Sequence, residues 1–274
     1  MNQLTSKSYT VAWDERLHVT QEFERQMRGN GDYLIWDRCT EEQRFVKWKR
    51  ADDVRYFGHV YNSLVDFSYT EHDVFIFSAG DILCDDFPAF VRKVEMMMEA
   101  DPDIWLMAPH FPTDPESGMP TAILQSEAYP EMYLTTHING LYWAMRRDLA
   151  LMLLAYYEWI LDKGYMNFRT MVTGHCLDWV YSAMVLLHNK KTYRDMSTEM
   201  REIEGTSYST KNASYECNMV RDRYIDWAGK HGITENAVRA AYNVMILKTR
   251  GVPNHFIELQ QAYPLMKARG DFFV

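Results

Sequence analysis

One short stretch constrains the fold more than any other part of the chain: residues 74–81, Val-Phe-Ile-Phe-Ser-Ala-Gly-Asp. Its first four residues are apolar, which is typical of a strand buried on both faces of a parallel sheet. The small residues 78–80 allow the backbone to turn closely past a neighbour, and Asp81 follows. Ligands of open α/β sheets bind outside the carboxyl ends of strands, where a phosphate-bound hard cation needs oxygen ligands. Asp81 is therefore a candidate metal ligand; the alternative is that it caps a helix beginning near Phe87.

The patterns before and after this stretch alternate between strand and helix, as in α/β proteins. Strands are expected at 9–13, 33–36, 74–77 and 103–108, and helices at 15–28, 53–67, 87–99, 147–161, 174–188, 220–229 and 236–249. Prolines at 109, 112, 115, 120 and 130 predict a long loop over 109–130. We therefore expect an α/β domain over residues 1–215, with a mostly parallel sheet flanked by helices, and a helical C-terminal extension over 216–274.

Charge and cysteine content limit the partners and the compartment. The chain of 274 residues has a formal net charge of −9, which argues against a general polyanion binder. Residues 230–274 differ, with six Lys or Arg against three Asp or Glu, a local charge of +3. This tail either completes the core or binds an acceptor or partner. Four dispersed cysteines, a polar N-terminus and no apolar run of ~18 residues predict a cytoplasmic protein without a membrane span.

Three stretches, taken in order, resemble nucleotide-sugar glycosyltransferases of the GT-A fold, of the family-two kind. Residues 75–83 resemble the strand and D-x-D turn that hold the metal and the donor diphosphate, although Ala79 stands where the first Asp would be. Residues 174–180 resemble a glycine-led segment ending in Asp-Trp, whose Asp faces the acceptor. Residues 202–209 resemble the loop after the last sheet strand, where relatives often place a metal-binding His and this chain has Glu202.

The resemblance covers residues 9–215 and implies a metal-dependent hexosyl- or pentosyltransferase that uses a nucleotide-diphosphate sugar, with a UDP-sugar expected. A divalent cation stabilises the charge that grows on the leaving diphosphate, and a carboxylate can accept the proton of the acceptor hydroxyl. The implied metal is Mn²⁺ or Mg²⁺ on Asp81 and Glu202, and the implied catalytic base is Asp178, for which a helix cap is the alternative role. The implied donor-binding residues are Asp37, Gly58, Asn62, Gly80 and Asp81. The implied acceptor-binding residues are His137, Asn139, Gly140, Tyr142, Trp143, His175 and Trp179, of which His175 is also a second candidate base.

Several alternatives stay open at this point. The acceptor is either a saccharide or a hydroxymethylated base in phage DNA, in which case the compartment is the host cytoplasm. A catalytically inactive GT-A-like binding or scaffold protein is the second hypothesis, supported by Ala79. A nucleotidyltransferase is the third, but a basic Gly-rich phosphate loop near the N-terminus is missing, because the glycines of residues 27–32 follow a helix. The sequence gives no indication of the oligomeric state.

Overall fold

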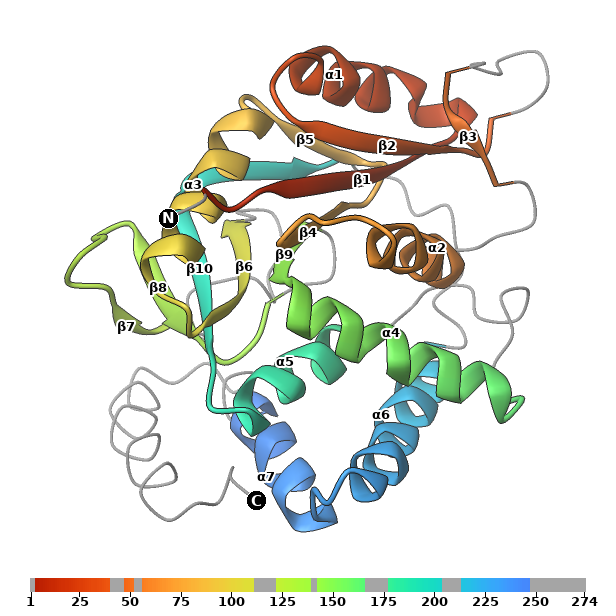
Figure 1. Ribbon diagram of the computed structural model, residues 1–274, viewed down its shortest axis with the longest axis vertical. Coiled ribbons are helices and arrows are strands. Elements are labelled where there is room, and N and C mark those ends of the chain that lie inside the picture. Colours follow the sequence, from red (N-terminus) through yellow and green to blue (C-terminus); the bar gives the residue numbers. More distant parts are fainter. Residues whose placement is uncertain are drawn as a thin grey trace.

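The computed structural model describes residues 3–39, 47–51, 56–110, 122–138, 142–165, 177–203 and 213–246. Within these ranges the chain forms ten strands and seven α-helices (Figure 1). The strands are β1 (Ser6–Ala12), β2 (Asp32–Asp37), β3 (Lys49–Arg50), β4 (Val74–Ser78), β5 (Ile82–Cys84), β6 (Ile104–His110), β7 (Ala122–Gln125), β8 (Met132–Thr135), β9 (Tyr142–Arg146) and β10 (Lys191–Glu202). The helices are the 3-10 helix η1 (Asp14–Arg16) and α1 (Leu17–Met27), α2 (Tyr56–Ser68), α3 (Phe87–Ala100), α4 (Arg147–Asp162), α5 (Leu177–Leu187), α6 (Ala213–Lys230) and α7 (Glu235–Ile246).

The sheet has the strand order β3-β2-β1-β4-β9-β6-β10-β8-β7, and β5 pairs with β10 outside this path. Strands β1, β2, β3 and β4 are joined by parallel pairings, and β10 is parallel to β6. Strand β9 lies between β4 and β6 and is antiparallel to both, so β6 and β10 point the same way as β1 and β4. The carboxyl ends of these parallel strands therefore meet at one edge of the sheet, which we call the carboxyl edge.

The two faces of the sheet bury separate apolar clusters. In β4, Phe75 and Phe77 belong to the cluster under α2, α4 and α5, whereas Val74 and Ile76 belong to the cluster under α1 and α3. All five residues of β4 are buried, as the apolar run predicts for a strand covered on both faces. Figure 1 shows α1 on one side of the sheet and α2, α4 and α5 on the other.

Helices α6 and α7 form an outer layer against α4 and α5, on the side away from the sheet (Figure 1). Their aromatic residues join the cluster under α4 and α5: the Tyr224 ring is 5.5 Å from Tyr156, and the Trp227 ring is 5.7 Å from Tyr156. The Tyr156 hydroxyl also donates to the Val220 carbonyl. Within the described residues, these helices extend the apolar cluster under α4 and α5, and the domain boundary expected at residue 215 falls in the first turn of α6.

Most of the expected elements are confirmed within a few residues of their predicted ends. Six strands were not among the expected ones: β3, β5, β7, β8, β9 and the long β10. Strand β7 occupies part of the region predicted as a loop over 109–130, of which residues 111–121 lie outside the described residues. Strand β5 has only three residues and pairs antiparallel with the end of β10, through Leu83 opposite Arg201. Helix α6 begins at Ala213, seven residues before the start expected at residue 220.

A bulge in β10 makes the β5 pairing possible. Asp195 pairs with Pro109 of β6, and the next pair along the two strands is Glu199 with His110, so β10 bends away between them. The Asp195 carboxylate is fully buried and organises this bend. It accepts hydrogen bonds from the Ser197 backbone N–H at 3.0 Å, the Ser197 hydroxyl at 2.8 Å, the Thr198 hydroxyl at 2.6 Å and Lys93 Nζ at 2.9 Å. Burial alone raises the pKa of Asp195, but these hydrogen bonds outweigh it and lower the pKa below its ordinary value.

We expect Asp195→Ala to lower the free energy of unfolding by about 3 kcal/mol at pH 7, because it leaves buried donors without their acceptor. A carboxyl with a lowered folded-state pKa stabilises the protein above its unfolded-state pKa of about 3.9, and this stabilisation is lost as the pH falls through the folded-state value. The difference between wild type and variant should therefore shrink below about pH 4. Urea unfolding at several pH values measures it, with Asp162→Ala, at an exposed site on α4, as the control. A difference that does not depend on pH would contradict this role of the carboxylate.

Candidate functional site at the carboxyl edge

The chain segments that leave β1, β2 and β4 lie next to one another at the carboxyl edge. Strand β1 is paired in parallel with β2 and with β4, so the residues after Ala12, Asp37 and Ser78 emerge side by side. The turn after β4 contains Ala79, Gly80 and Asp81, and it leads directly into β5. This edge is where an open α/β sheet is expected to bind a ligand.

Gly80 is required by the packing of this turn against β1. A Cβ atom placed on Gly80 would lie 1.9 Å from the Val11 carbonyl oxygen and 3.5 Å from the Trp13 ring. Only a residue without a side chain can pass this close to the backbone of β1. The close approach that the sequence indicated is therefore made to β1. The role of Gly80 in donor binding stays a prediction.

Asp81 forms a partly buried ion pair with Arg16, a residue that no sequence pattern singled out. Arg16 Nη1 lies 2.8 Å from Asp81 Oδ2, and only 9% of the Arg16 side chain and 16% of the Asp81 side chain are exposed. Asp81 Oδ1 is buried and has no hydrogen-bond partner of standard geometry among the described residues. Burial raises the pKa of Asp81 above its ordinary value, and the charge of Arg16 opposes this rise.

The alternative role of Asp81 as a helix cap is wrong. Helix α3 begins at Phe87, and its N-cap is Asp86, whose carboxylate accepts from the Ala89 backbone N–H at 2.9 Å. Strand β5 separates Asp81 from this helix. The carboxylate of Asp81 is therefore directed toward the carboxyl edge by the turn after β4, and α3 does not explain its presence.

The end of β10 brings Glu202 next to Asp81 along the backbone. Glu202 pairs with Ile82, and the Ile203 N–H donates to the Asp81 carbonyl at 2.9 Å. The side chain of Glu202 lies outside the described part of the structure. Among the described residues, no three His, Cys, Asp or Glu side chains form a metal-binding group. Asp81 Oδ1, a buried oxygen with no hydrogen-bond partner among the described residues, fits one ligand of a divalent cation, and Glu202, the last residue of β10, is the second expected ligand.

Asp37, at the end of β2, is turned into the protein. It is 0% exposed, its carboxylate accepts from the Cys39 backbone N–H at 2.9 Å, and Arg50 Nη1 lies 3.8 Å from Oδ1. The Asp37 carboxylate was expected to contact a donor, but it is not exposed. It holds the chain segment that follows β2 through the Cys39 N–H. Gly58 and Asn62 lie in the first two turns of α2, which begins after β3 at the carboxyl edge; Gly58 is buried and Asn62 is half-buried.

Asp178 lies at the amino end of α5, and the topology brings this end to the carboxyl edge. Helix α5 leads through residues 188–190 into β10, whose first residue Lys191 pairs with Ile104 at the start of β6. The carboxyl end of α5 is therefore at the opposite edge of the sheet. A helix of 11 residues is about 16 Å long, which is close to the length of a five-residue strand. Asp178 must then lie near the edge at which Asp81 emerges.

A contact between side chains supports this placement. Tyr181 is one helical turn after Asp178, and its ring is 5.2 Å from the Trp143 ring of β9. Trp143 pairs with Phe77, one residue before the end of β4. Helix α5 therefore lies mainly over β6 and β10, and through Tyr181 it reaches the residue of β9 that is paired with the end of β4.

Asp178 is paired with His137, from a segment that follows β8. His137 Nε2 lies 3.0 Å from Asp178 Oδ2, and Asp178 Oδ1 accepts from the Trp179 backbone N–H at 3.0 Å. His137 is 5% exposed and is held by Thr135, whose hydroxyl donates to the His137 carbonyl at 3.0 Å. The side chain of Asp178 is 20% exposed, so it is the more accessible member of the pair. Asp178 is the second described residue of α5, so it is not the N-cap of that helix.

The other expected acceptor-binding residues fall into three groups. Trp179 is half-buried at the rim of the same region, with its ring 5.7 Å from that of His137. Tyr142 and Trp143 are 0% and 1% exposed, and their rings pack against Phe87 and Phe77, respectively. The expectation that these two rings stack on an acceptor is therefore corrected: helix α3 covers the face of β9 that carries Tyr142, and helix α5 covers the face that carries Trp143. Asn139, Gly140 and His175 lie outside the described residues.

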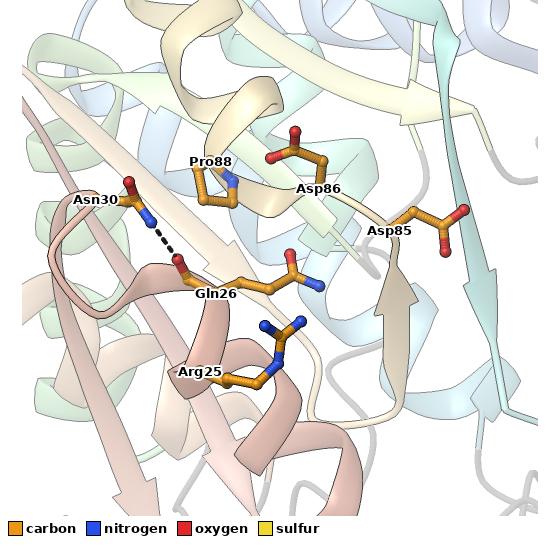
Figure 2. Close-up of a pocket in the computed structure, with 6 residues that line it drawn as sticks. All are labelled: Arg25, Gln26, Asn30, Asp85, Asp86 and Pro88. Atoms are coloured by element: carbon orange, nitrogen blue, oxygen red, sulfur yellow. Dashed lines mark hydrogen bonds between the residues drawn. The ribbon is translucent and has the colours of Figure 1, made fainter.

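A small hollow of about 230 Å³ lies elsewhere, between the end of α1 and the start of α3 (Figure 2). It is lined by Arg25, Gln26, Asn30, Asp85, Asp86 and Pro88, and none of the expected site residues borders it. Its central polar side chain already has partners. Gln26 donates to the Cys84 carbonyl at 2.9 Å and accepts from the Phe87 N–H at 2.8 Å, so it joins α1 to the β5–α3 connection. The hollow therefore lies at the contact between α1 and α3, and the carboxyl edge remains the candidate site.

Comparison with known proteins gives a fold and no family. No protein-family model and no curated protein sequence matches the chain. Among solved structures, GalNAc-T7 with UDP, GalNAc and Mn²⁺ is similar with a TM-score of 0.55 and 10% identity, over 97% of this chain and 58% of that one. A197 from STIV has a TM-score of 0.45 and 10% identity, over 74% of this chain and 87% of that one. Mannose-1-phosphate geranyltransferase from Thermus thermophilus has a TM-score of 0.47 and 10% identity, over 72% and 75% of the two chains.

The likeness to GalNAc-T7 confirms the expected fold class, a GT-A-like α/β sheet flanked by helices. The chain spans a little more than half the length of GalNAc-T7, since it covers 58% of that chain. Among the described helices, none has the length and the apolar character needed to cross a membrane.

Proposed function

We propose that the protein is a glycosyltransferase that moves a sugar from a nucleoside-diphosphate donor, with UDP as the expected nucleotide, to an acceptor hydroxyl. The observation that carries the proposal is the pair of carboxylates at one edge of a GT-A-like sheet. Asp81 follows β4, and one of its oxygens has no hydrogen-bond partner in the part of the chain that the structure describes; Asp178 is directed to the same edge by α5. These are the positions at which a sheet of this kind binds its ligand.

In this proposal each residue has one task. Asp81, with Glu202, would hold Mn²⁺ or Mg²⁺. The cation, when bound, stabilises the negative charge of the departing diphosphate. Asp178 accepts the proton of the acceptor hydroxyl while that oxygen bonds to the anomeric carbon. The bond from the anomeric carbon to the diphosphate oxygen breaks, and the diphosphate leaves with the electron pair. A single base of this kind fits one displacement with inversion at the anomeric carbon.

Two buried thiols support a reducing compartment, as expected for the cytoplasm. Cys39 and Cys84 are free, and burial raises their pKa values to about 12 and about 11. Such thiols are protonated at neutral pH and react slowly, so they suit a compartment in which disulfides do not form.

The acceptor is proposed as a saccharide or a hydroxymethylated base in DNA. The +3 charge of residues 230–274 favours the DNA acceptor, and the net charge of −9 favours the saccharide. Binding of duplex DNA measured over a range of salt concentrations separates them. Binding through phosphates weakens steeply as salt rises, so no salt-dependent binding would remove the DNA acceptor.

Titration with UDP and Mn²⁺ tests the proposed donor site. We expect wild-type protein to bind UDP with Mn²⁺ and to hydrolyse a UDP-sugar slowly, and Asp81→Asn to bind UDP–Mn²⁺ at least ~10-fold more weakly, because a cation loses an ionised oxygen ligand. The matched control is Asp85→Asn, four residues further on, whose side chain is 98% exposed. Calorimetry and donor hydrolysis are the measurements. Equal binding by Asp81→Asn and wild type would contradict the assignment of Asp81.

A second function is favoured by one observation. Ala79 occupies the place of the first D-x-D carboxylate and is 5% exposed, and Arg16 already pairs with the remaining carboxylate, so the turn is stable without a cation. An inactive GT-A-like scaffold would keep such a turn. Failure of the wild-type protein to bind or hydrolyse any nucleotide sugar in the same titrations would support the scaffold.

A further inference from the structure

We propose that Arg16 keeps Asp81 from binding a divalent cation alone, so that the cation and a nucleoside diphosphate bind only together. This inference rests on the proposed donor site and adds the order in which the site is filled. It starts from the fact that Asp81 Oδ2 is already occupied by the Arg16 guanidinium, at 2.8 Å.

Arg16 is fixed in this position by the end of β1. It closes the 3-10 helix η1, its backbone N–H donates to the Trp13 carbonyl at 3.0 Å, and it is 7% exposed. Asp81 is fixed from the other side, because Gly80 packs on the Val11 carbonyl and the Asp81 carbonyl accepts from Ile203. The ion pair therefore joins two turns whose backbones are held by the strands, Arg16 at the end of β1 and Asp81 after β4.

A cation on the remaining oxygen of Asp81 would lie close to the guanidinium. The two oxygens belong to one carboxylate, so both positive groups would share a single negative charge. Their repulsion is stronger here than in water, because the pair is largely removed from solvent. Ala79 supplies no second carboxylate at this turn, so any offset to the repulsion has to come from a group outside the turn, such as Glu202 at the end of β10. A cation alone should therefore bind weakly.

A diphosphate changes this balance because it carries several negative charges between the two positive groups. Its oxygens are ligands for a hard cation and acceptors for the planar fork of an arginine. Binding of the diphosphate and binding of the cation then favour each other, and the coupling is reciprocal. The coupling is measured by comparing the binding of Mn²⁺ alone, of UDP alone and of the two together.

The wild-type protein gives the first test. We expect Mn²⁺, followed by electron paramagnetic resonance of the free ion, to bind at least ~10-fold more tightly in the presence of saturating UDP than in its absence. Arg16→Gln should bind Mn²⁺ alone more tightly than wild type, by ~10-fold, and should show a smaller effect of UDP. Arg16→Lys keeps the charge and should resemble wild type. The control is Arg28→Gln, at an exposed partner of Glu24 at the end of α1.

The outcomes separate this inference from the donor-site proposal. If wild type binds neither UDP nor Mn²⁺ under any condition, the donor site itself is refuted. If UDP and Mn²⁺ bind but Mn²⁺ affinity is the same with and without UDP, the donor site stands and the role of Arg16 is refuted. The role of Arg16 is also refuted if Arg16→Gln, shown to be folded by circular dichroism, binds Mn²⁺ alone no better than wild type. Should Arg16→Gln not fold, the test depends on two other results. These are the Mn²⁺ affinity of wild type with and without UDP, and whether Arg16→Lys binds Mn²⁺ as wild type does.

Discussion

Gly80→Ala should unfold or severely destabilise the protein, with a loss of more than ~4 kcal/mol in the free energy of unfolding. The added methyl carbon would lie 1.9 Å from the Val11 carbonyl oxygen, far inside any permitted contact. The obstacle is backbone, so no side-chain rotation can relieve it. Relief requires β4 and β1 to separate, and these strands are the centre of the parallel ladder. Urea unfolding followed by circular dichroism, together with the yield of soluble protein, measures the effect.

The matched control is Gly229→Ala in α6, where a Cβ meets nothing within 4 Å. There, alanine should be neutral or stabilising by up to about 1 kcal/mol, because glycine is unfavourable inside a helix. If Gly80→Ala is as stable as Gly229→Ala, the turn after β4 does not approach β1 as described, and the placement of Asp81 loses its basis.

Asp178→Asn should lower sugar transfer by ~10²–10⁴-fold while UDP–Mn²⁺ binding stays at the wild-type level. Asparagine keeps the shape of the side chain and can still contact His137, but it cannot accept a proton. The measurements are transfer to an acceptor under single-turnover conditions and calorimetric binding of UDP–Mn²⁺. The control is Asp148→Asn, because Asp148 is also the second residue of a helix, α4, and is exposed. The control removes the same favourable charge at a helix amino end and should leave transfer unchanged.

His137 gives the second half of this test. His137→Gln should lower transfer by about 10-fold, because the Nε2 contact at 3.0 Å orients the Asp178 carboxylate. In the double variant the His137 change should add almost nothing to the loss caused by Asp178→Asn, since both act through one group. Losses that multiply independently would mean that His137 has a separate role. Full transfer by Asp178→Asn would leave Asp178 a structural residue only.

Arg16 illustrates what a sequence pattern cannot reveal. It stands in a charged stretch that has the periodicity of a helix surface, and helix η1–α1 is indeed present there. Its partner Asp81 is 65 residues further along the chain. Only the parallel pairing of β1 with β4 brings the two ends together, and no local pattern records that strand order. His137 and Asp178, separated by 41 residues, are a similar case: each was singled out alone, and their contact was not expected.

Tyr142 and Trp143 show that a sequence can also suggest site residues that the structure places in the core. Aromatic residues beside a glycine suit a sugar-binding floor as well as they suit a core, and composition does not separate the two. The decisive fact is that helices cover both faces of β9, with α3 over Tyr142 and α5 over Trp143. Asp37 is similar, because a carboxylate at a strand end can face a ligand or hold its own loop. Its hydrogen bond to the Cys39 N–H shows that here it holds the loop.

The amino-acid sequence alone determined the fold class and the place of its centre, because an uninterrupted apolar run such as that of β4 is stable only when both faces are covered. It also determined where the carboxylates Asp81 and Asp178 occur, at the end of a strand and the start of a helix. The tertiary structure alone decided which groups meet: Arg16 with Asp81, His137 with Asp178, and Gly80 with the backbone of β1. The physical reason is that periodicity encodes which side of an element is buried, whereas contacts between distant segments follow from strand order and register.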